Sequence, residues 1–425
     1  MLNKQWKLND YITYILLTLV LLSAWTDING IFTELPQIIL TQPEGWRLGS
    51  HLGFVASMSN IAPLALVFCK CAYRNRPLNI VPINYIVISI GMISCFLLVF
   101  FWSNTSWIFN EKRSLALLIL TFFLALLDCT SMVSFSHYIT RFRTEFTSAL
   151  FLGESLTMII PSLLAIAQGN GRLTCVFSSN NSTTSNISIT PVYETARFSV
   201  SIYFLCIFFL LVLSFVAFVL LQWTDIAKNN NQDATKEPMI DSDITNQPHR
   251  LTPLFYLLLL FGALYTSSVV YGMVFSISAY VLMPYGHQIF YLGTILSPWM
   301  FTLVWLFGTI KPFLAKRYLL LMILLGSITF SFDLMIAFRS PCVPLINTIQ
   351  GNILVLVIWL STFLLLGYPR LIIANYVRAH SPNGMFWFGA NVQLGALIGS
   401  VISYLLVQTF SLFKERLPCQ QIQCL

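Results

Sequence analysis

Long apolar segments recur along the whole of this 425-residue chain, and they constrain its fold more than any other feature. Each holds about 20 residues, and a helix of that length crosses a hydrocarbon layer of roughly 30 Å with its backbone hydrogen bonds satisfied internally. Only 9% of the residues are charged, whereas soluble domains carry about a quarter. The sequence therefore predicts an all-α membrane protein that crosses the bilayer many times.

Charges, prolines, glycines and asparagines divide the apolar sequence into about eleven predicted spans. These cover residues 10–35, 50–69, 80–102, 114–136, 145–168, 198–222, 252–276, 286–309, 318–338, 351–377 and 384–412. The polar stretch 223–250 follows the sixth span and has little apolar surface to bury, so we interpret it as a cytoplasmic linker. It separates an N-terminal lobe, residues 1–222, from a C-terminal lobe, residues 251–425.

Basic residues form short clusters between the apolar segments instead of one continuous face, which argues against a nucleic-acid partner for a chain of net charge +7. Cytoplasmic loops of membrane proteins are enriched in Lys and Arg. In this chain the richer side includes Lys4, Arg74, Arg143, Arg250 and Arg370. We therefore predict that the N-terminus lies inside and that the C-terminus, after an odd number of spans, lies outside.

Glycosylation sequons give a separate indication of sidedness, because they are modified only in the lumen or outside the cell. The sequons begin at Asn104, Asn180, Asn181 and Asn186. All of them fall in loops that the charge distribution places outside. The two indications predict the same orientation.

The chain contains nine cysteines, an odd number. Cys95, Cys129 and Cys206 lie within predicted spans, where we interpret them as reduced apolar residues. Cys342 and Cys419 both fall outside in this topology, where disulfides persist. We predict a disulfide between these two cysteines.

The sequence lacks the motifs of the common catalytic and nucleotide-binding sites. It has no Walker A loop, no Gly-x-Gly-x-x-Gly helix opening and no His-Glu-x-x-His, and its five histidines are scattered. A filter-like loop and an Arg-rich voltage-sensing helix are missing too. The sequence therefore favours a carrier over an enzyme, an ATP-driven pump or a channel, and it indicates no cofactor.

Polar side chains in the first predicted span are the densest group of candidates for a solute site. A charge at the centre of a membrane helix costs about 2.5–3.5 kcal/mol on insertion scales, so such groups usually face a cavity or a partner. Helical periodicity places Trp25 and Asn29 on one face, and Asp27 and Glu34 on roughly the opposite face. Both pairs reach one cavity only if the helix unwinds.

Gly30 and Pro36 offer places for such unwinding, which is a recurrent feature of transporter sites. The alternative is that these polar residues only pack between helices or lie at the outer interface. Asp128 and Glu154 are deeper within other spans, and we expect them to be functional or paired. Asp333 lies closer to an outer end, so we interpret it as structural.

The second and last spans add amide and aromatic groups. Asn60–Pro63 interrupts the backbone hydrogen bonds of its helix, while Trp387, Asn391 and Gln393 offer an aromatic plane and amides. Gly395 to Gly399 forms a small-xxx-small pattern that we interpret as helix packing. Together these residue types favour a solute with an aromatic ring and several hydroxyl or amide groups, such as a nucleoside, a flavin, a pterin or an aromatic amino acid.

Several blocks spread along the chain form a more specific signature. They are Ala24–Pro36, Pro43–Trp46, Asn60–Pro63, Leu120–Ser131, Phe151–Leu156, Ala165–Gly171, Ser340–Cys342 and Val392–Gly395. These blocks resemble the riboflavin transporters, solute carrier family 52. The resemblance implies a facilitative riboflavin carrier of the plasma membrane, with eleven spans and a two-lobed (6+5) bundle of the major facilitator type that works without ATP.

Matching motif positions then imply which side chains line or support the flavin path. They are Trp25, Asn29, Glu34, Asn60, Asp128, Glu154, Tyr280 and Gln393. Trp25 is expected to stack on the isoalloxazine ring, while the amides and acids bind its polar edge or the ribityl hydroxyl groups. The chain departs from the family at Tyr271-Gly272, where relatives carry Asn before the Gly, and at Asp27, where they carry an uncharged residue.

Two alternatives remain open from the sequence. A carrier of a nucleoside or another aromatic metabolite is served equally well by eleven spans in two lobes. A membrane receptor that transports nothing is the second alternative, and its outer loops would then form the working surface.

Overall fold

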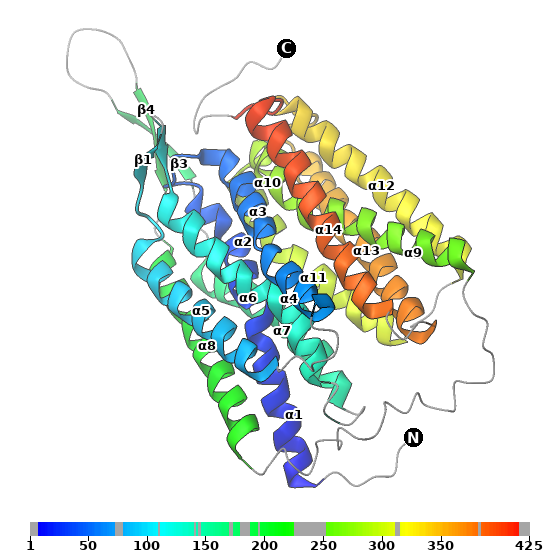
Figure 1. Cartoon of the computed structure of the whole chain (residues 1–425). Helices are drawn as coiled ribbons and strands as arrows, with labels where there is room; N and C mark the ends of the chain where they lie inside the picture. The colour runs from blue at the N-terminus through cyan, green and yellow to red at the C-terminus, as the bar shows by residue number, and fades with distance from the viewer. Residues whose placement is uncertain are drawn as a thin grey trace, which may run out of the picture.

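The computed structural model describes residues 7–72, 80–108, 111–139, 142, 146–169, 173–178, 188–193, 196–224, 252–310, 315–380 and 384–415. These residues form a bundle of helices with two short β-hairpins at one end (Figure 1). We call this end the hairpin end, and the opposite end, where the first helix begins, the N-terminal end. The predicted all-α membrane fold is confirmed, and the hairpins are additions that the sequence had not indicated.

The described residues of the first part of the chain form eight α-helices, two 3-10 turns and both hairpins. The helices are α1 (Leu8–Leu21), η1 (Leu22–Ala24), α2 (Thr26–Ile38), η2 (Gly45–Arg47), α3 (Leu48–Met58), α4 (Ile61–Ala72), α5 (Ile80–Phe101), α6 (Leu115–Ile139), α7 (Thr147–Gln168) and α8 (Val200–Trp223). The antiparallel hairpins pair β1 (Ser106–Ile108) with β2 (Glu111–Arg113), and β3 (Leu173–Ser178) with β4 (Ser188–Tyr193).

Among the described residues of the second part of the chain, the regular elements are all helices. Its elements are α9 (Pro253–Ser267), the π-helix η6 (Ser268–Val274), α10 (Phe275–Leu282), η7 (Met283–Tyr285), α11 (His287–Ile310), α12 (Lys316–Arg339), α13 (Ile349–His380), α14 (Gly384–Tyr404) and the π-helix η8 (Leu405–Thr409).

Local sequence explains several helix ends. Ser199 caps α8 by accepting a hydrogen bond from the Ile202 amide, and Pro253 occupies the first turn of α9, where a missing amide hydrogen does no harm. Gly169 ends α7 at a φ of 75°, a conformation that glycine adopts without steric cost. The apolar runs between such signals are therefore free to form long helices.

Helices occupy all the predicted spans, but four of these spans are interrupted: α1 and α2 share the first, α3 and α4 the second, α9 to α10 the seventh, and α14 with η8 the last. In the described part of the chain, seven helices are long and apolar enough to cross a membrane, or eight if the bent first pair counts as one span. The figure of eleven spans thus stays a prediction.

The outer surface of the bundle is apolar, as a lipid-facing surface requires. Ile93 on α5, Phe209 on α8 and Ile328 on α12 are each more than half exposed. In water such a surface would promote aggregation, whereas in a bilayer it is solvated by acyl chains.

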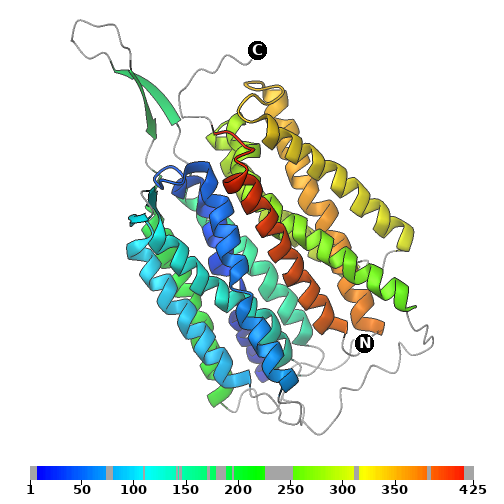
Figure 2. The same cartoon turned by 45° about the horizontal axis from the view of Figure 1, so that its top comes forward.

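The helices form two groups that lie side by side, α1 to α8 in one and α9 to α14 in the other (Figures 1 and 2). Within the first group α5 packs on α6 and α8, and within the second α13 packs on α11 and α12. Across the boundary, α11 contacts α2 and α7, while α3 contacts α10 and α14. A functional site between the groups would therefore be walled by helices from both halves of the chain.

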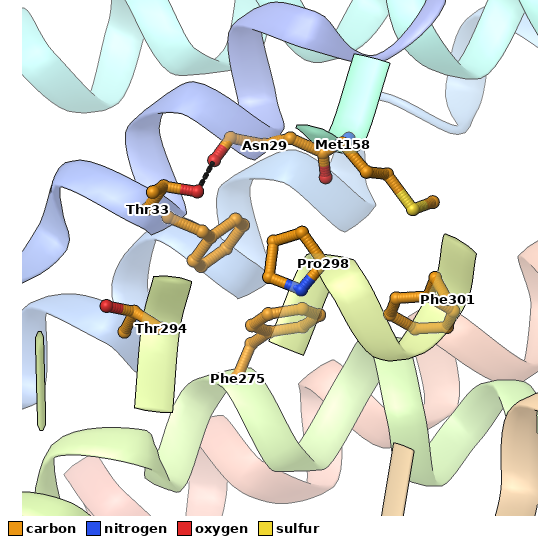
Figure 3. Close-up of a pocket in the computed structure, with 8 residues that line it drawn as sticks. Asn29, Thr33, Met158, Phe275, Thr294, Pro298 and Phe301 are labelled. Atoms are coloured by element: carbon orange, nitrogen blue, oxygen red, sulfur yellow. Dashed lines mark hydrogen bonds between the residues drawn. The ribbon is translucent and has the colours of Figure 1, made fainter. Parts of the chain in front are cut away.

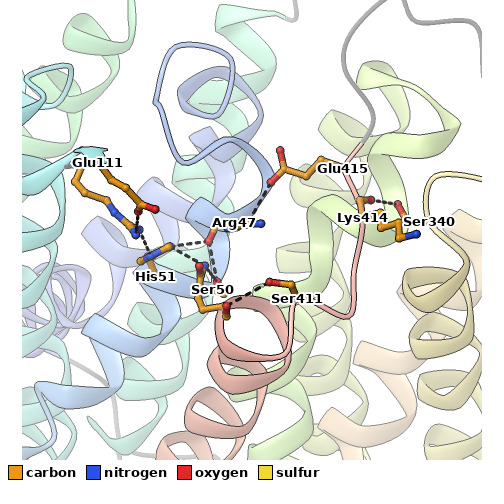
Figure 4. A network of polar contacts seen from close by, with 10 residues as sticks. Arg47, Ser50, His51, Glu111, Ser340, Ser411, Lys414 and Glu415 are labelled. Atoms are coloured by element: carbon orange, nitrogen blue, oxygen red, sulfur yellow. Dashed lines mark hydrogen bonds and ion pairs between the residues drawn. The ribbon is translucent and has the colours of Figure 1, made fainter. Parts of the chain in front are cut away.

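Polar contacts join the two groups at the hairpin end. The Gln408 amide donates to Ser50 Oγ at 3.0 Å, and Arg47 lies 3.9 Å from the Glu415 carboxylate (Figure 4). His287 Nε2 lies 2.9 Å from the carbonyl oxygen of Pro36. These contacts hold the groups together at this end of the bundle.

Candidate functional site

The first span is broken at Trp25, which has a φ of −153° and a ψ of 4° between η1 and α2. The segments Leu8–Ala24 and Thr26–Ile38 meet at an angle of 51°. The span is therefore interrupted, as one of the two readings of the sequence allowed, but at Trp25 and not at Gly30 or Pro36. Gly30 lies within regular α2 helix and packs against α8, and Pro36 lies inside the same helix.

The carbonyl groups that the break frees are satisfied within the bundle. Thr26 Oγ1 donates to the Leu22 carbonyl, and Ser131 Oγ on α6 donates to the Ala24 carbonyl at 3.3 Å. Because buried backbone groups need such partners, these hydroxyl groups stabilise the break. The break in turn aims the first residues of α2 at the centre of the bundle.

A cavity of about 1030 Å³, including the part open to solvent, lies between the two helix groups. Its lining comprises Trp25, Ile28, Asn29, Phe32, Gly53, Ala56, Ser57, Asn60, Ala125, Cys129, Glu154, Thr157 and Met158 from the first group, and Tyr271, Phe275, Arg370, Val392, Gln393 and Ala396 from the second. Five of the eight residues predicted for the site are thereby brought together: Trp25, Asn29, Asn60, Glu154 and Gln393.

Amide groups supply much of the hydrogen-bonding capacity of the cavity. The Asn29 side-chain amide donates to the Thr157 carbonyl at 3.4 Å, a long bond that ties α2 to α7. The main-chain carbonyl of Asn29 accepts from the Thr33 hydroxyl at 2.7 Å (Figure 3). Asn60 donates to the Ser57 carbonyl at 3.0 Å. Within the described residues, the Gln393 side chain makes no hydrogen bond and remains available to a solute.

Aromatic rings close the cavity toward the hairpin end. Phe32 of α2 and Phe275 of α10 meet with ring centres 5.0 Å apart, joining the two helix groups. Beyond them a smaller pocket of about 320 Å³ shares Asn29, Phe32, Met158 and Phe275 with the cavity (Figure 3). Aromatic planes of this kind stack on flat ring systems.

Among the described residues that line the cavity two are charged, and only Glu154 of the two had been predicted for the site. Glu154 comes from α7, and Arg370 comes from α13. The Arg370 guanidinium lies 4.6 Å from the centre of the Tyr271 ring, which stacks on Phe301. The charge distribution of the sequence assigns Arg370 to a cluster of inside basic residues, although Arg370 falls within the predicted span 351–377. A charged residue within a span was the sequence feature that could have identified it as a site residue.

Three predicted site residues lie outside this lining. Glu34 is 1% exposed and accepts a hydrogen bond of 2.9 Å from Gln168, because α2 turns this face toward α7 and α8. Tyr280 is fully buried near the hairpin end, where it packs edge-on against Trp46 with ring centres 5.8 Å apart. Asp128 is fully buried beside Asp27.

Asp27 and Asp333, which were also considered from the sequence, lie away from the cavity as well. Asp27 is 1% exposed and accepts from the Ile28 amide at 2.9 Å, on the face of α2 opposite Trp25 and Asn29. Asp333 accepts a hydrogen bond of 2.7 Å from Thr362 of the neighbouring helix. Of the two departures from the family pattern, Tyr271 lines the cavity and Asp27 does not.

Several predicted modification sites lie at the limits of the described residues. Asn104 is exposed at the hairpin end, whereas Asn180, Asn181 and Asn186 fall outside the described residues. Cys342 is disulfide-bonded, but Cys419 also lies outside them, so the pairing stays a prediction. Cys95, Cys129 and Cys206 are free.

The chain is similar to known proteins in sequence and in fold. The sequence model of "Solute carrier family 52, riboflavin transporter" matches residues 9–415. Member 3 of that family from Bos taurus is 28% identical over 95% of this chain and 97% of its own length. Member 3-A from Danio rerio is 30% identical over 93% of this chain and 95% of its own.

In fold, the chain resembles the nucleoside transporter NupG, with a TM-score of 0.55 over 95% of this chain and 92% of NupG. The two sequences are only 12% identical. This likeness therefore shows a fold of the major facilitator type and leaves the solute undecided.

Proposed function

Because the chain belongs to the riboflavin transporters of solute carrier family 52, we propose that it carries riboflavin into cells across the plasma membrane by alternating access. The observation that carries the proposal is the central cavity, which helices of both groups line and which the Phe32–Phe275 pair covers toward the hairpin end. Carriers of this architecture expose such a site to one side at a time by rocking two lobes around it.

In this proposal the hairpin end faces outward and the N-terminal end faces the cytoplasm. The exposed Asn104 sequon and both hairpins then lie outside. An odd number of spans puts the C-terminus on the same side in this proposal. Contacts such as Ser50–Gln408 then close the outer side of the bundle.

The moving units are the lobes 1–222 and 251–425, joined by the linker 223–250. For the outward-facing state, the contacts at the hairpin end must separate while the lobes remain intact. No ATP and no cofactor enter this cycle, because the flavin's own concentration gradient is sufficient to drive facilitative transport.

The side chains around the cavity suit a flavin. Riboflavin has a flat tricyclic ring system and a ribityl chain with four hydroxyl groups. Trp25 and Phe32 offer aromatic planes to the rings, while Asn29, Asn60 and Gln393 offer amides to the hydroxyl groups.

Uptake of labelled riboflavin into cells that express the chain tests this proposal. We expect saturable uptake that unlabelled riboflavin and lumiflavin block, and that excess uridine, which lacks the tricyclic ring, leaves unchanged. Block by uridine would instead favour the nucleoside carrier.

Deletion within the outer loop 169–197 separates the carrier from the receptor. A carrier with its site between the lobes should keep most of its riboflavin uptake, whereas a receptor that works through its outer loops should lose its response.

A further inference from the structure

Glu154 and Arg370 are the two charged side chains among the nineteen described residues that line the cavity. Glu154 belongs to α7 in the first helix group and Arg370 to α13 in the second. The cavity therefore has one acid and one base, each carried by a different lobe.

These two groups face the same space without forming an ion pair. The ion pairs between described residues are Arg47–Glu415 and Arg113–Glu111, so the Glu154 and Arg370 side chains stand more than the 4.0 Å of a salt bridge apart. They are nevertheless close enough for the charge of Arg370 to act on the Glu154 carboxylate. The space between them can accept a ligand that pairs with both.

Tyr271 holds Arg370 in position. The guanidinium lies 4.6 Å from the ring centre, and the ring is itself stacked on Phe301 at 5.8 Å with an angle of 9° between the planes. A cation over an aromatic face is held without consuming its hydrogen-bond donors. The donors of Arg370 therefore stay free for a ligand in the cavity.

The flavin ring system offers the complementary pattern. Its pyrimidine edge presents a carbonyl oxygen, the N3–H group and a second carbonyl oxygen, in that order. A carboxylate only accepts hydrogen bonds and a guanidinium only donates them. We infer that Glu154 accepts the hydrogen bond from flavin N3–H and that Arg370 donates to a neighbouring ring carbonyl. Each lobe then contributes one hydrogen bond to the same edge of the solute.

This inference rests on the proposed riboflavin transport and specifies which atoms of the flavin are recognised. It also gives the departure at Tyr271 a role, since this residue positions the guanidinium. Binding one edge from both lobes would draw the lobes together around the solute, as the closing step of an alternating-access cycle requires.

The test uses 3-methylriboflavin, which has a methyl group in place of the N3 hydrogen and is otherwise the same molecule. Inhibition constants of riboflavin and of this analogue are measured against labelled riboflavin uptake. In the unaltered chain we expect the analogue to bind at least about tenfold more weakly, the loss typical for a hydrogen bond to a charged group. Equal inhibition by the two compounds would overturn the inference while leaving riboflavin transport established.

Two variants assign the effect to the residues. Glu154→Ala should bring the ratio of the two inhibition constants close to one, while Arg370→Met should weaken both compounds and preserve the ratio. Arg317→Met, which alters an exposed arginine at the N-terminal end of α12, is the matched control and should change neither.

For a variant that no longer transports, the ratio is obtained from the dissociation constants of the two flavins for the purified protein. These constants are measured by the quenching of flavin fluorescence. An unchanged ratio in Glu154→Ala would exclude this carboxylate as the N3–H acceptor. Absence of saturable riboflavin uptake by the unaltered chain would contradict the proposed function itself, and the two failures are thus distinguishable.

Discussion

Arg47 and Glu415 join the two helix groups at the hairpin end, with Arg47 Nε 3.9 Å from a carboxylate oxygen of Glu415. Both side chains are partly exposed, at 47% and 35%, so the pair itself contributes little stability. Its significance lies in its position, because Glu415 also packs against Gly45 and must leave this site when the hairpin end opens.

The state of the hairpin end should depend on outside pH through Glu415. Burial raises the pKa of this carboxyl group above its ordinary 4.5, and the charge of Arg47 only partly opposes that effect. In the open state Glu415 would be exposed and its pKa would return to the ordinary value. The closed state then binds the proton more tightly, so it gains stability as the pH falls through the raised pKa toward 4.5.

A Phe275→Cys variant measures how often the hairpin end is open, since a membrane-impermeant thiol reagent reaches this cysteine from outside only in the open state. The rate of labelling is compared with that of the same cysteine in a Glu415→Gln background. We expect the ratio of the two rates to decrease as the outside pH is lowered from the raised pKa of Glu415 toward 4.5. The Gln variant should show only the intrinsic pH dependence of the thiol. Parallel pH profiles in the two backgrounds would contradict the role of Glu415.

Asn29→Ala should lower the kcat/KM of riboflavin uptake by about tenfold or more, because it removes a cavity amide and its link to α7. The protein should still reach the cell surface, as measured by surface biotinylation. Asn391→Ala is the control, since this amide bonds to Trp387 of its own helix and lies outside the cavity lining. Normal uptake kinetics in Asn29→Ala would remove Asn29 from the site.

Trp25 should act through its ring. Trp25→Ala should weaken flavin binding by about tenfold, the effect expected when stacking of an aromatic pair is lost. Trp25→Phe keeps an aromatic plane and should retain most of the affinity. Titration of the purified variants by flavin fluorescence compares them, and equal loss in both would show that the indole N–H or the local backbone, instead of stacking, governs binding.

Gly399 permits the close packing of α14 on η6. A Cβ atom at this position would stand 2.0 Å from the Ser268 carbonyl oxygen, so Gly399→Val forces the helices apart. Overpacking of this kind costs about 1–3 kcal/mol or more, and we expect a lower melting temperature and less protein at the surface. Gly389→Ala on the same helix is the control, because no described residue has an atom within 4 Å of its Cβ position. Equal thermal stability of the two variants would contradict the packing role.

Helical periodicity predicted that Asn29 lies on the face opposite to Asp27 and Glu34, and α2, which is regular from Thr26 onward, keeps that division. Trp25 lies at the break before α2 and lines the same cavity as Asn29. The break lies at Trp25 and not at Gly30 or Pro36, the places considered from the sequence, because neither a glycine nor a proline marks the actual position. Its stability depends on Ser131, a residue more than one hundred positions away, and local sequence carries no sign of that contact.

The π-helix η6 in the seventh span is a further difference, and Tyr280 follows it on α10 near the hairpin end. A π-helix is not well specified by hydropathy. Arg370 is a different case, because the predicted span 351–377 already contained it and only its charge led to its assignment to an inside cluster. In the structure it lies within α13 and lines the cavity.

The central claim is that this chain is a riboflavin carrier with one site exposed to alternate sides of the membrane. Counterflow in liposomes tests it most directly: the purified chain is reconstituted in liposomes loaded with unlabelled riboflavin and then exposed to a low concentration of labelled riboflavin. We predict that the label accumulates transiently inside above its outside concentration and that Asn29→Ala reduces this overshoot. Label that merely equilibrates, as through a channel, or that does not enter at all would contradict the claim.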